Sequence, residues 1–158
     1  MTRISDMSST QRKAWLIVLA DGAVFLWFWQ KMTVGLSLNP IGYDIGEFGR
    51  IIFGLVVLTV ILHVVIAGIF DLLARKGGNG RDERDIEIER RGAFWGYRVL
   101  QIGVGIITIG ILMSASFEIG FQPSVLFETP VQIIFFLIVF SYIADLVKHG
   151  VMIYGYGR

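Results

Sequence analysis

The sequence has no cysteine, only three prolines in 158 residues, and few charged side chains. The absence of cysteine excludes disulfides, thiolate metal sites, iron–sulfur clusters and cysteine nucleophiles. Asp, Glu, Lys and Arg together make up 17% of the chain, which is too little polar surface to cover a water-facing globule. The formal net charge of +1 gives no indication of nucleic-acid binding. No catalytic signature stands out either, so we expect a non-enzymatic protein.

Hydrophobic residues dominate instead, at 54% of the chain and a mean hydropathy of +0.67. A helix needs about 20 apolar residues to cross the ~30 Å hydrocarbon core of a bilayer. Four segments approach that length, and we predict that each crosses a membrane: residues 14–30, 51–73, 93–117 and 131–147. A secretory signal peptide is the less favoured interpretation of the first segment, because the segment contains Asp21 and ends in an aromatic run.

The basic residues gather in three places, namely the amino-terminal tail, the connector after the second segment and the carboxyl-terminal tail. By the positive-inside rule, these three parts face the cytoplasm. We therefore predict an all-α membrane protein, a four-transmembrane-helix bundle of two parallel helical hairpins with both termini cytoplasmic, in the inner membrane of a prokaryote. The predicted divisions are a tail at 1–13, a first hairpin at 14–73, a charged hinge at 74–92, a second hairpin at 93–147 and a tail at 148–158.

The two predicted hairpins end alike. Asp71 precedes a leucine near the end of the second segment, and Asp145 precedes a leucine near the end of the fourth. Basic side chains and a glycine follow within a few residues in both cases. Duplication of one hairpin explains this likeness, and so does the general similarity of membrane hairpins at their ends.

A short charged motif opens the second half of the chain. It reads Asp82-Glu83-Arg84-Asp85, and Ile88-Glu89, Gly92 and Tyr97 follow it. The same half closes on Asp145-Leu146-Val147-Lys148 and a Tyr-Gly-Tyr-Gly-Arg tail. This pattern resembles small bacterial and archaeal integral membrane proteins that carry an Asp-Glu-Arg-Asp motif after their second span and are mostly labelled as of unknown function. The resemblance covers residues 81–158 and implies a four-helix membrane protein without an assigned activity.

Charge within the apolar segments is costly and usually faces a partner. Asp21 lies eight residues after Lys13, and Arg98 lies seven residues after Arg91. At ~1.5 Å of rise per residue, both lie roughly 10–12 Å inside the same interface. We therefore predict an intramembrane Asp21–Arg98 ion pair. The alternative is that Arg98 extends to the lipid headgroups alone.

A shallower polar ring is predicted at the ends of the second and fourth segments, formed by Asp71, Asp145, Lys148 and His149. His63 lies near the middle of the second segment and could relay protons toward Asp71. The alternative is a buried histidine that hydrogen-bonds a neighbouring helix. Asp71, Asp145 and His149 could hold a metal, but interface roles explain them more simply, so we expect neither a metal nor a cofactor.

Small residues recur along one face of the third segment. They are spaced 4, 7, 7 and 4 residues apart, which aligns them on a helix: Gly92, Gly96, Gly103, Gly110 and Ser114. Such a stripe lets another helix approach closely. The opposite face carries Arg98 and Gln101. We predict tight packing along the stripe.

These features favour an interaction, regulatory or accessory subunit that docks through the hinge residues Asp82, Glu83, Arg84 and Asp85. The hinge itself is expected to be a salt-bridged helical extension of the third segment, with Glu87 paired to Arg91. The alternative is a small proton-coupled transporter that uses Asp21 and His63. The expected partners are the lipid bilayer and another membrane or cytoplasmic protein, a homo-oligomer stays open, and no nucleic acid is expected.

Overall fold

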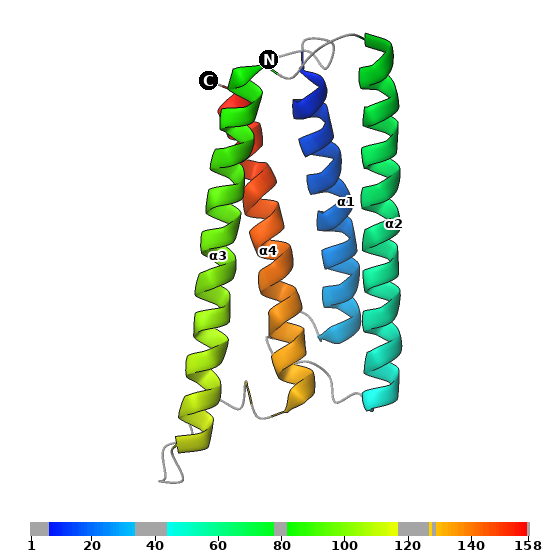
Figure 1. Ribbon diagram of the computed structural model, residues 1–158. Helices are drawn as coiled ribbons and strands as arrows, with labels where there is room; N and C mark the ends of the chain where they lie inside the picture. The colour runs from blue at the N-terminus through cyan, green and yellow to red at the C-terminus, as the bar shows by residue number, and fades with distance from the viewer. Residues whose placement is uncertain (1–6, 34–43, 78–81, 117–126, 128, 158) are drawn as a thin grey trace.

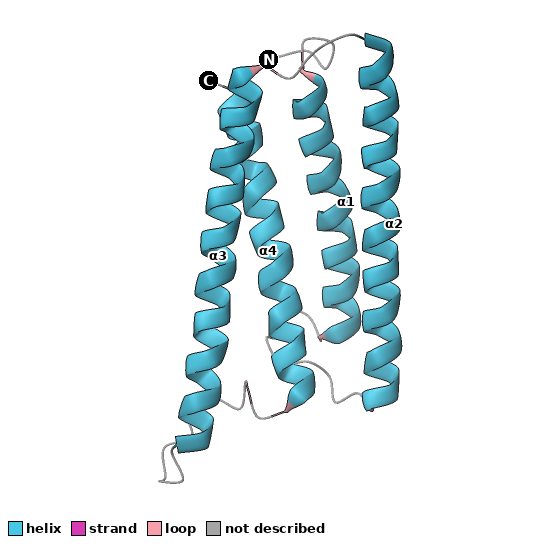
Figure 2. Cartoon of the chain, in the orientation of Figure 1, coloured by secondary structure: helices cyan, strands magenta, loops and turns pink. Residues whose placement is uncertain are grey.

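The computed structural model describes residues 7–33, 44–77, 82–116, 127 and 129–157, and the regular elements in these residues are all α-helices (Figures 1 and 2). The helices are α1 Ser9–Met32, α2 Ile45–Gly77, α3 Glu83–Ser116 and α4 Pro130–Tyr156. For residues 73–77 and 114–116 the helical backbone alone is described. The all-helical class predicted from the sequence is confirmed for the described residues.

Three of the helices contain segments long and apolar enough to cross a membrane: Ile45–Leu72, Glu83–Met113 and Pro130–Tyr156. Their outer faces expose large hydrophobic side chains, such as Phe53 on α2 and Ile102 on α3, as expected where lipid replaces water. The sequence predicted a fourth span in α1, which is not among the three. The polar first turns of α1 and the buried Asp21 lower its hydropathy.

The helices lie side by side in the order α3, α4, α1, α2 (Figure 1). α4 packs against both α3 and α1, and α1 packs against α2. The starts of α1 and α3 and the ends of α2 and α4 gather at one end, which we call the hinge end. There the Tyr156 hydroxyl donates to Asp85 Oδ1 at 2.7 Å, and the Thr10 hydroxyl donates to Asp85 Oδ2 at 3.4 Å. Asp85 thereby joins the ends of three helices.

Side-chain caps explain where two of the helices begin. The Ser8 side chain accepts a hydrogen bond from the backbone N–H of Gln11 at 3.1 Å and starts α1. Thr129 and Gln132 form a reciprocal capping box at the start of α4. Pro130 follows as the first helical residue, where its missing N–H costs nothing.

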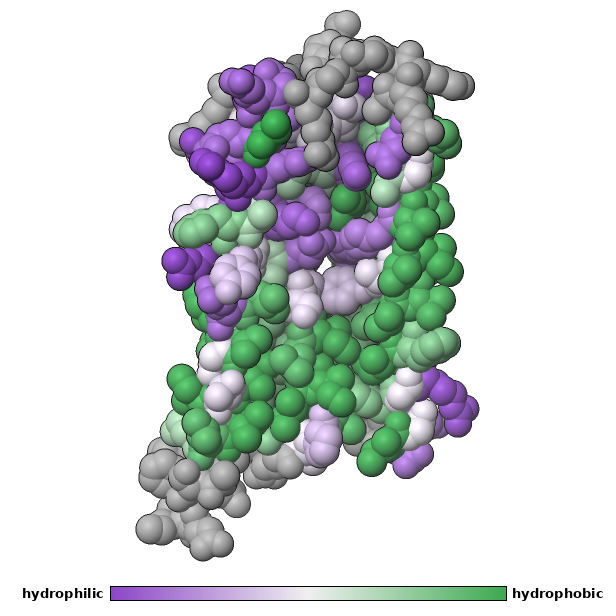
Figure 3. Space-filling view, viewed as in Figure 1, coloured by the Kyte–Doolittle hydropathy of each residue, from purple (hydrophilic) through white to green (hydrophobic). Residues whose placement is uncertain are grey.

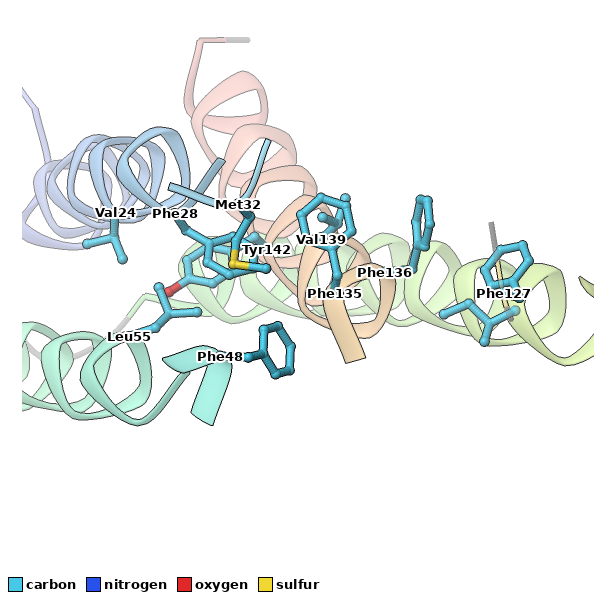
Figure 4. Close-up of a cluster of buried hydrophobic side chains, with 11 residues drawn as sticks. Val24, Phe28, Met32, Phe48, Leu55, Phe127, Phe135, Phe136, Val139 and Tyr142 are labelled. Atoms are coloured by element: carbon cyan, nitrogen blue, oxygen red, sulfur yellow. The ribbon is translucent and has the colours of Figure 1, made fainter. Parts of the chain in front are cut away.

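A core rich in aromatic side chains fills part of the bundle (Figure 4). Side chains from three helices point toward one another there: Val24, Phe28 and Met32 of α1, Phe48 and Leu55 of α2, and Phe135, Val139 and Tyr142 of α4. The Phe28 and Phe135 rings lie 5.7 Å apart between centroids, a spacing typical of stabilising aromatic pairs. This core closes the middle of the bundle toward the opposite end.

The predicted small-residue stripe of α3 lies against α4 and Phe127. A Cβ atom at Gly92 would lie 2.7 Å from the Lys148 carbonyl oxygen, and one at Gly96 would lie 2.9 Å from that of Ala144. Cβ atoms at Gly103 and Gly110 would overlap the rings of Phe140 and Phe127 respectively. The side chain of Ser114 lies outside the described residues. The absence of side chains at these glycines therefore allows α3 and α4 to pack this closely.

Candidate functional site

Asp21 is the buried acidic residue around which the site is built. It lies in the middle of α1 and is only 2% exposed. Neither carboxylate oxygen has a hydrogen-bond partner among the residues that the structure describes. Because a buried carboxylate without a partner is strongly destabilising, its surroundings must supply a compensating group.

His63 reaches Asp21 from α2. Its Nε2 lies 3.6 Å from Asp21 Oδ2 and 4.0 Å from Asp145 Oδ2. Its other ring nitrogen, Nδ1, is 2.9 Å from the carbonyl oxygen of Thr59, one turn earlier. A carbonyl can only accept, so Nδ1 carries the hydrogen and donates it. In the neutral ring, the Nε2 lone pair therefore faces two carboxylates.

Asp145 and His149 complete the group from α4. The Nδ1–H of His149 donates to the Asp145 carbonyl oxygen at 2.9 Å. The same nitrogen lies 3.2 Å from Asp145 Oδ2, yet this oxygen has no hydrogen-bond partner. The other oxygen, Oδ1, lies 3.7 Å from Lys148 Nζ. One ligand atom from each of Asp21, Asp145 and His149 lies within 4.8 Å of the others.

We call Asp21, His63, Asp145 and His149 the acid–histidine cluster. Two carboxylates and two imidazoles converge here from α1, α2 and α4. Most of the inward-facing atoms are acceptors, namely Asp21 Oδ1 and Oδ2, Asp145 Oδ2 and, in the neutral ring, His63 Nε2, whereas the Nδ1–H of His149 lies 3.2 Å from Asp145 Oδ2. Lone pairs that face one another in a medium of low dielectric repel strongly. A cation placed among them would convert this repulsion into attraction, so the arrangement is suited to cation binding.

Two cavities meet at the cluster. One has a volume of about 290 Å³ and mainly apolar walls, with Leu55, Val60 and Ile138 beside Asp21. The other has a volume of about 450 Å³ and extends to the hinge end, where Thr10, Lys13 and Glu89 line it. His63 and Asp145 line both cavities. Figure 3 shows hydrophilic residues gathered over the hinge-end half of one face and reaching a hollow near its middle.

A pair of hydroxyls forms part of the apolar cavity's wall. The side chains of Thr59 and Tyr142 hydrogen-bond to each other across the gap between α2 and α4. The Thr59 hydroxyl also contacts the Leu55 carbonyl oxygen at 2.9 Å. Neither residue was singled out from the sequence. Thr59 lies four residues before His63, and this spacing is the sequence signal that could have connected Thr59 with the site.

The predicted Asp21–Arg98 ion pair is absent from the described structure. Arg98 is exposed, and its guanidinium lies over the Phe94 ring at 5.2 Å from the centroid. Asp21 faces His63 and Asp145 instead. The reason is the order in which the helices lie side by side. α4 lies between α1 and α3, and it brings Asp145 and His149 to the depth of Asp21.

The other predicted polar residues divide into two groups. Asp145, Lys148 and His149 of the predicted ring lie together on α4, whereas Asp71 is exposed on α2, two turns beyond His63. The proposed relay from His63 toward Asp71 is also not formed, because Nε2 of His63 points to Asp21 and Asp145. His63 is nevertheless beside Asp21, the residue with which the transporter alternative had grouped it.

The hinge residues lie apart from the cluster. Asp82, Glu83 and Arg84 are exposed at the start of α3, and residues 78–81 lie outside the described part of the chain. Asp85 is partly buried by its bonds to Tyr156 and Thr10. The helical extension of α3 is confirmed from Glu83 onward, and Arg91 Nε donates to Glu87 Oε1 at 2.8 Å as predicted.

Comparison of the chain with protein-family models, with curated proteins and with solved structures finds no match. The acid–histidine cluster and its two cavities are the features of the described structure that bear most directly on function.

Proposed function

We propose that this protein is a small membrane transporter for a cation, and that Asp21 and His63 belong to its binding site. The observation that carries this proposal is the position of the acid–histidine cluster where two cavities meet. Ionisable residues buried among membrane helices are costly and characteristically mark ion pathways. Acceptor atoms that face one another without donors among the described residues favour a bound cation or proton at this position.

The cavity on the hinge side would provide the route of access. Lys13 and Glu89 near its mouth and His149 and Asp145 near its end supply polar groups, although apolar residues such as Ile17 and Met152 line it as well. On the far side of the cluster, the aromatic core with Phe28 and Phe135 blocks the bundle. This combination is that expected of a transporter open to one side of the membrane and closed to the other.

The proposal assigns this open side to the cytoplasm. Two parallel hairpins, α1 with α2 and α3 with α4, would place the hinge and both chain ends on the cytoplasmic side of a prokaryotic inner membrane. Support comes from the basic residues of the hinge end, such as Arg12, Arg84 and Arg91, which the positive-inside rule keeps in the cytoplasm. α1, although less apolar, would cross the membrane with Asp21 turned inward.

The test is cation uptake by proteoliposomes that contain the purified protein and a trapped indicator chosen for the ion supplied, either a divalent-cation indicator or an indicator for Na⁺ or K⁺. With an imposed Mn²⁺ gradient, we expect uptake by the unaltered protein and none above empty vesicles for Asp21→Ala. Asp71→Asn is the matched control, because this aspartate is exposed and outside the cluster, and it should transport normally. Equal, empty-vesicle rates for all three proteins under Mn²⁺, Zn²⁺, Na⁺ and K⁺ gradients would refute the proposal.

A second candidate is an accessory or regulatory subunit that docks another protein at the hinge end. A groove of about 400 Å³ favours it, because Arg84 lies there beside the apolar Ile88 and Trp95, next to the paired Glu87 and Arg91. Such a surface fits a segment with apolar anchors and an acidic residue for Arg84. The mass of the protein extracted from its native membrane in mild detergent separates the candidates. A stoichiometric second polypeptide, lost on Arg84→Glu, supports docking, whereas a chain extracted alone supports transport.

A further inference from the structure

We infer that the acid–histidine cluster binds a divalent transition-metal ion. This inference rests on the proposed function in one respect, because it names the cation that the transporter carries. It also stands on the cluster's own geometry, which can be tested by equilibrium binding without any transport.

The spacing of the ligand atoms fits a metal ion. Zinc and its neighbours bind imidazole nitrogen and carboxylate oxygen at about 2.0–2.2 Å, so two ligands of a tetrahedral ion lie about 3.4 Å apart. His63 Nε2 and Asp21 Oδ2 are 3.6 Å apart, and His63 Nε2 and Asp145 Oδ2 are 4.0 Å apart. A ring nitrogen of His149 lies within 4.8 Å of both carboxylates. Against the ligand spacing of about 3.4 Å, side-chain movements of up to about 1.4 Å would bring both carboxylates and an imidazole onto one ion.

The orientation of His63 is that of a metal ligand. Histidine ligands usually donate their second ring N–H to a carbonyl or carboxylate, which fixes the ring and leaves the other nitrogen free to bind. His63 does this through Nδ1–H and the Thr59 carbonyl oxygen. The site is thus held ready for an ion in part by the backbone of α2.

The charges also favour a cation. With both carboxyl groups deprotonated, as metal binding requires, Asp21 and Asp145 contribute two negative charges, and Lys148, at 3.7 Å from Oδ1 of Asp145, compensates one of them. A bound cation would compensate the other. This matters most for Asp21, which is only 2% exposed.

The ligand types narrow the choice of metal. Mg²⁺ and Ca²⁺ take all-oxygen sites, which imidazole nitrogens do not provide. Cu⁺ is selected by thiolate and thioether ligands, and the four residues of the cluster include neither a cysteine nor a methionine. A mixed set of carboxylate oxygen and imidazole nitrogen suits Mn²⁺, Fe²⁺, Co²⁺ and Zn²⁺.

Equilibrium binding of Co²⁺ and Mn²⁺ to the detergent-purified full chain tests the inference. We expect one ion per chain, with a visible Co²⁺ absorption typical of mixed nitrogen and oxygen ligands. Asp21→Asn and His63→Gln should each weaken binding about a hundredfold or more, since the loss of an outer-shell partner alone costs 10–100-fold. Asp71→Asn should bind like the unaltered protein. Both cluster substitutions keep the side-chain size, so an unchanged helical circular dichroism spectrum serves as the check on folding.

Binding that is absent, or that is equal in Asp21→Asn, His63→Gln and the unaltered protein, would overturn the metal site. The result can be separated from that of the flux assay. Stoichiometric binding without any flux would sustain the metal site and refute the transporter. Flux of a monovalent cation without Co²⁺ or Mn²⁺ binding would sustain the transporter and refute the metal site.

Discussion

At the scale of single residues, Asp21 is buried, and no described residue donates a hydrogen bond to its carboxylate. The nearest group that could help is His63, whose Nε2 lies 3.6 Å from Oδ2 and would attract the carboxylate only as a protonated ring or through an ion held between them. An unsatisfied buried acceptor costs about 1–3 kcal/mol, and more when it is charged. We therefore expect Asp21 to destabilise the metal-free protein, and its role to be the binding of the metal ion.

This leads to a prediction for Asp21→Asn in chelator-treated protein. Removal of the charge should raise the free energy of unfolding by about 1–3 kcal/mol, because no partner is lost. Thermal unfolding in detergent measures the change. Asp71→Asn should stay within about 0.5 kcal/mol, as expected of an exposed side chain. A destabilised Asp21→Asn would contradict the metal site and indicate an ion pair with protonated His63.

A second residue-scale prediction concerns the contact of Tyr156 with Asp85. Tyr156→Phe removes the 2.7 Å hydrogen bond that ties the end of α4 to the start of α3. Since the acceptor is a partly buried carboxylate, the loss should cost about 1–2 kcal/mol. Tyr97→Phe is the control, because Tyr97 only accepts an exposed bond from Gln101 on its own helix. Equal thermal stability of the two variants would show that the Asp85 contact contributes nothing.

At the scale of elements, the α3–α4 interface depends on glycines with identified neighbours. Gly103 faces the Phe140 ring, whereas nothing lies within 4 Å of a Cβ atom at Gly105, two residues later on the same helix. This pair separates the effect of packing from that of helix propensity.

Gly103→Leu should therefore lower the free energy of unfolding by about 2–3 kcal/mol or more, because overpacking forces the helices apart. Gly105→Leu should be neutral or stabilising by up to about 1 kcal/mol, because leucine favours helix more than glycine does. Thermal unfolding in detergent compares the two. If both variants behave alike, the glycine stripe does not determine how α3 packs.

The four helices were predicted from the sequence, whereas the order in which they lie side by side was not. Long apolar runs are sufficient to predict four helices, and the i,i+4 spacing of Glu87 and Arg91 is sufficient to predict their contact. Depth along a helix, however, is a one-dimensional quantity. It placed Asp21 level with Arg98, but it could not show that α4 lies between α1 and α3. The approach of His63 to Asp21 likewise depends on which faces of α1 and α2 meet.

At the scale of the whole molecule, the orientation in the membrane is a prediction that single cysteines can test. The chain contains none, so each introduced thiol is the only one. Ser8→Cys at the hinge end should be protected from an impermeant thiol reagent in intact cells. Asp44→Cys, just before α2 at the opposite end, should react. The reverse pattern would place the hinge end outside the cytoplasm.

The most direct test of the central claim is the reactivity of Ala67→Cys in inside-out membrane vesicles. Ala67 lines the hinge-side cavity one turn from His63, so a charged thiol reagent should reach it and Mn²⁺ should slow the reaction. Gly54→Cys, exposed on the outer face of α2, should stay unreactive in lipid. Reaction at Ala67→Cys with protection by Mn²⁺ is the predicted result. An unreactive Ala67→Cys, or one that Mn²⁺ does not protect, would contradict a cation path to the cluster.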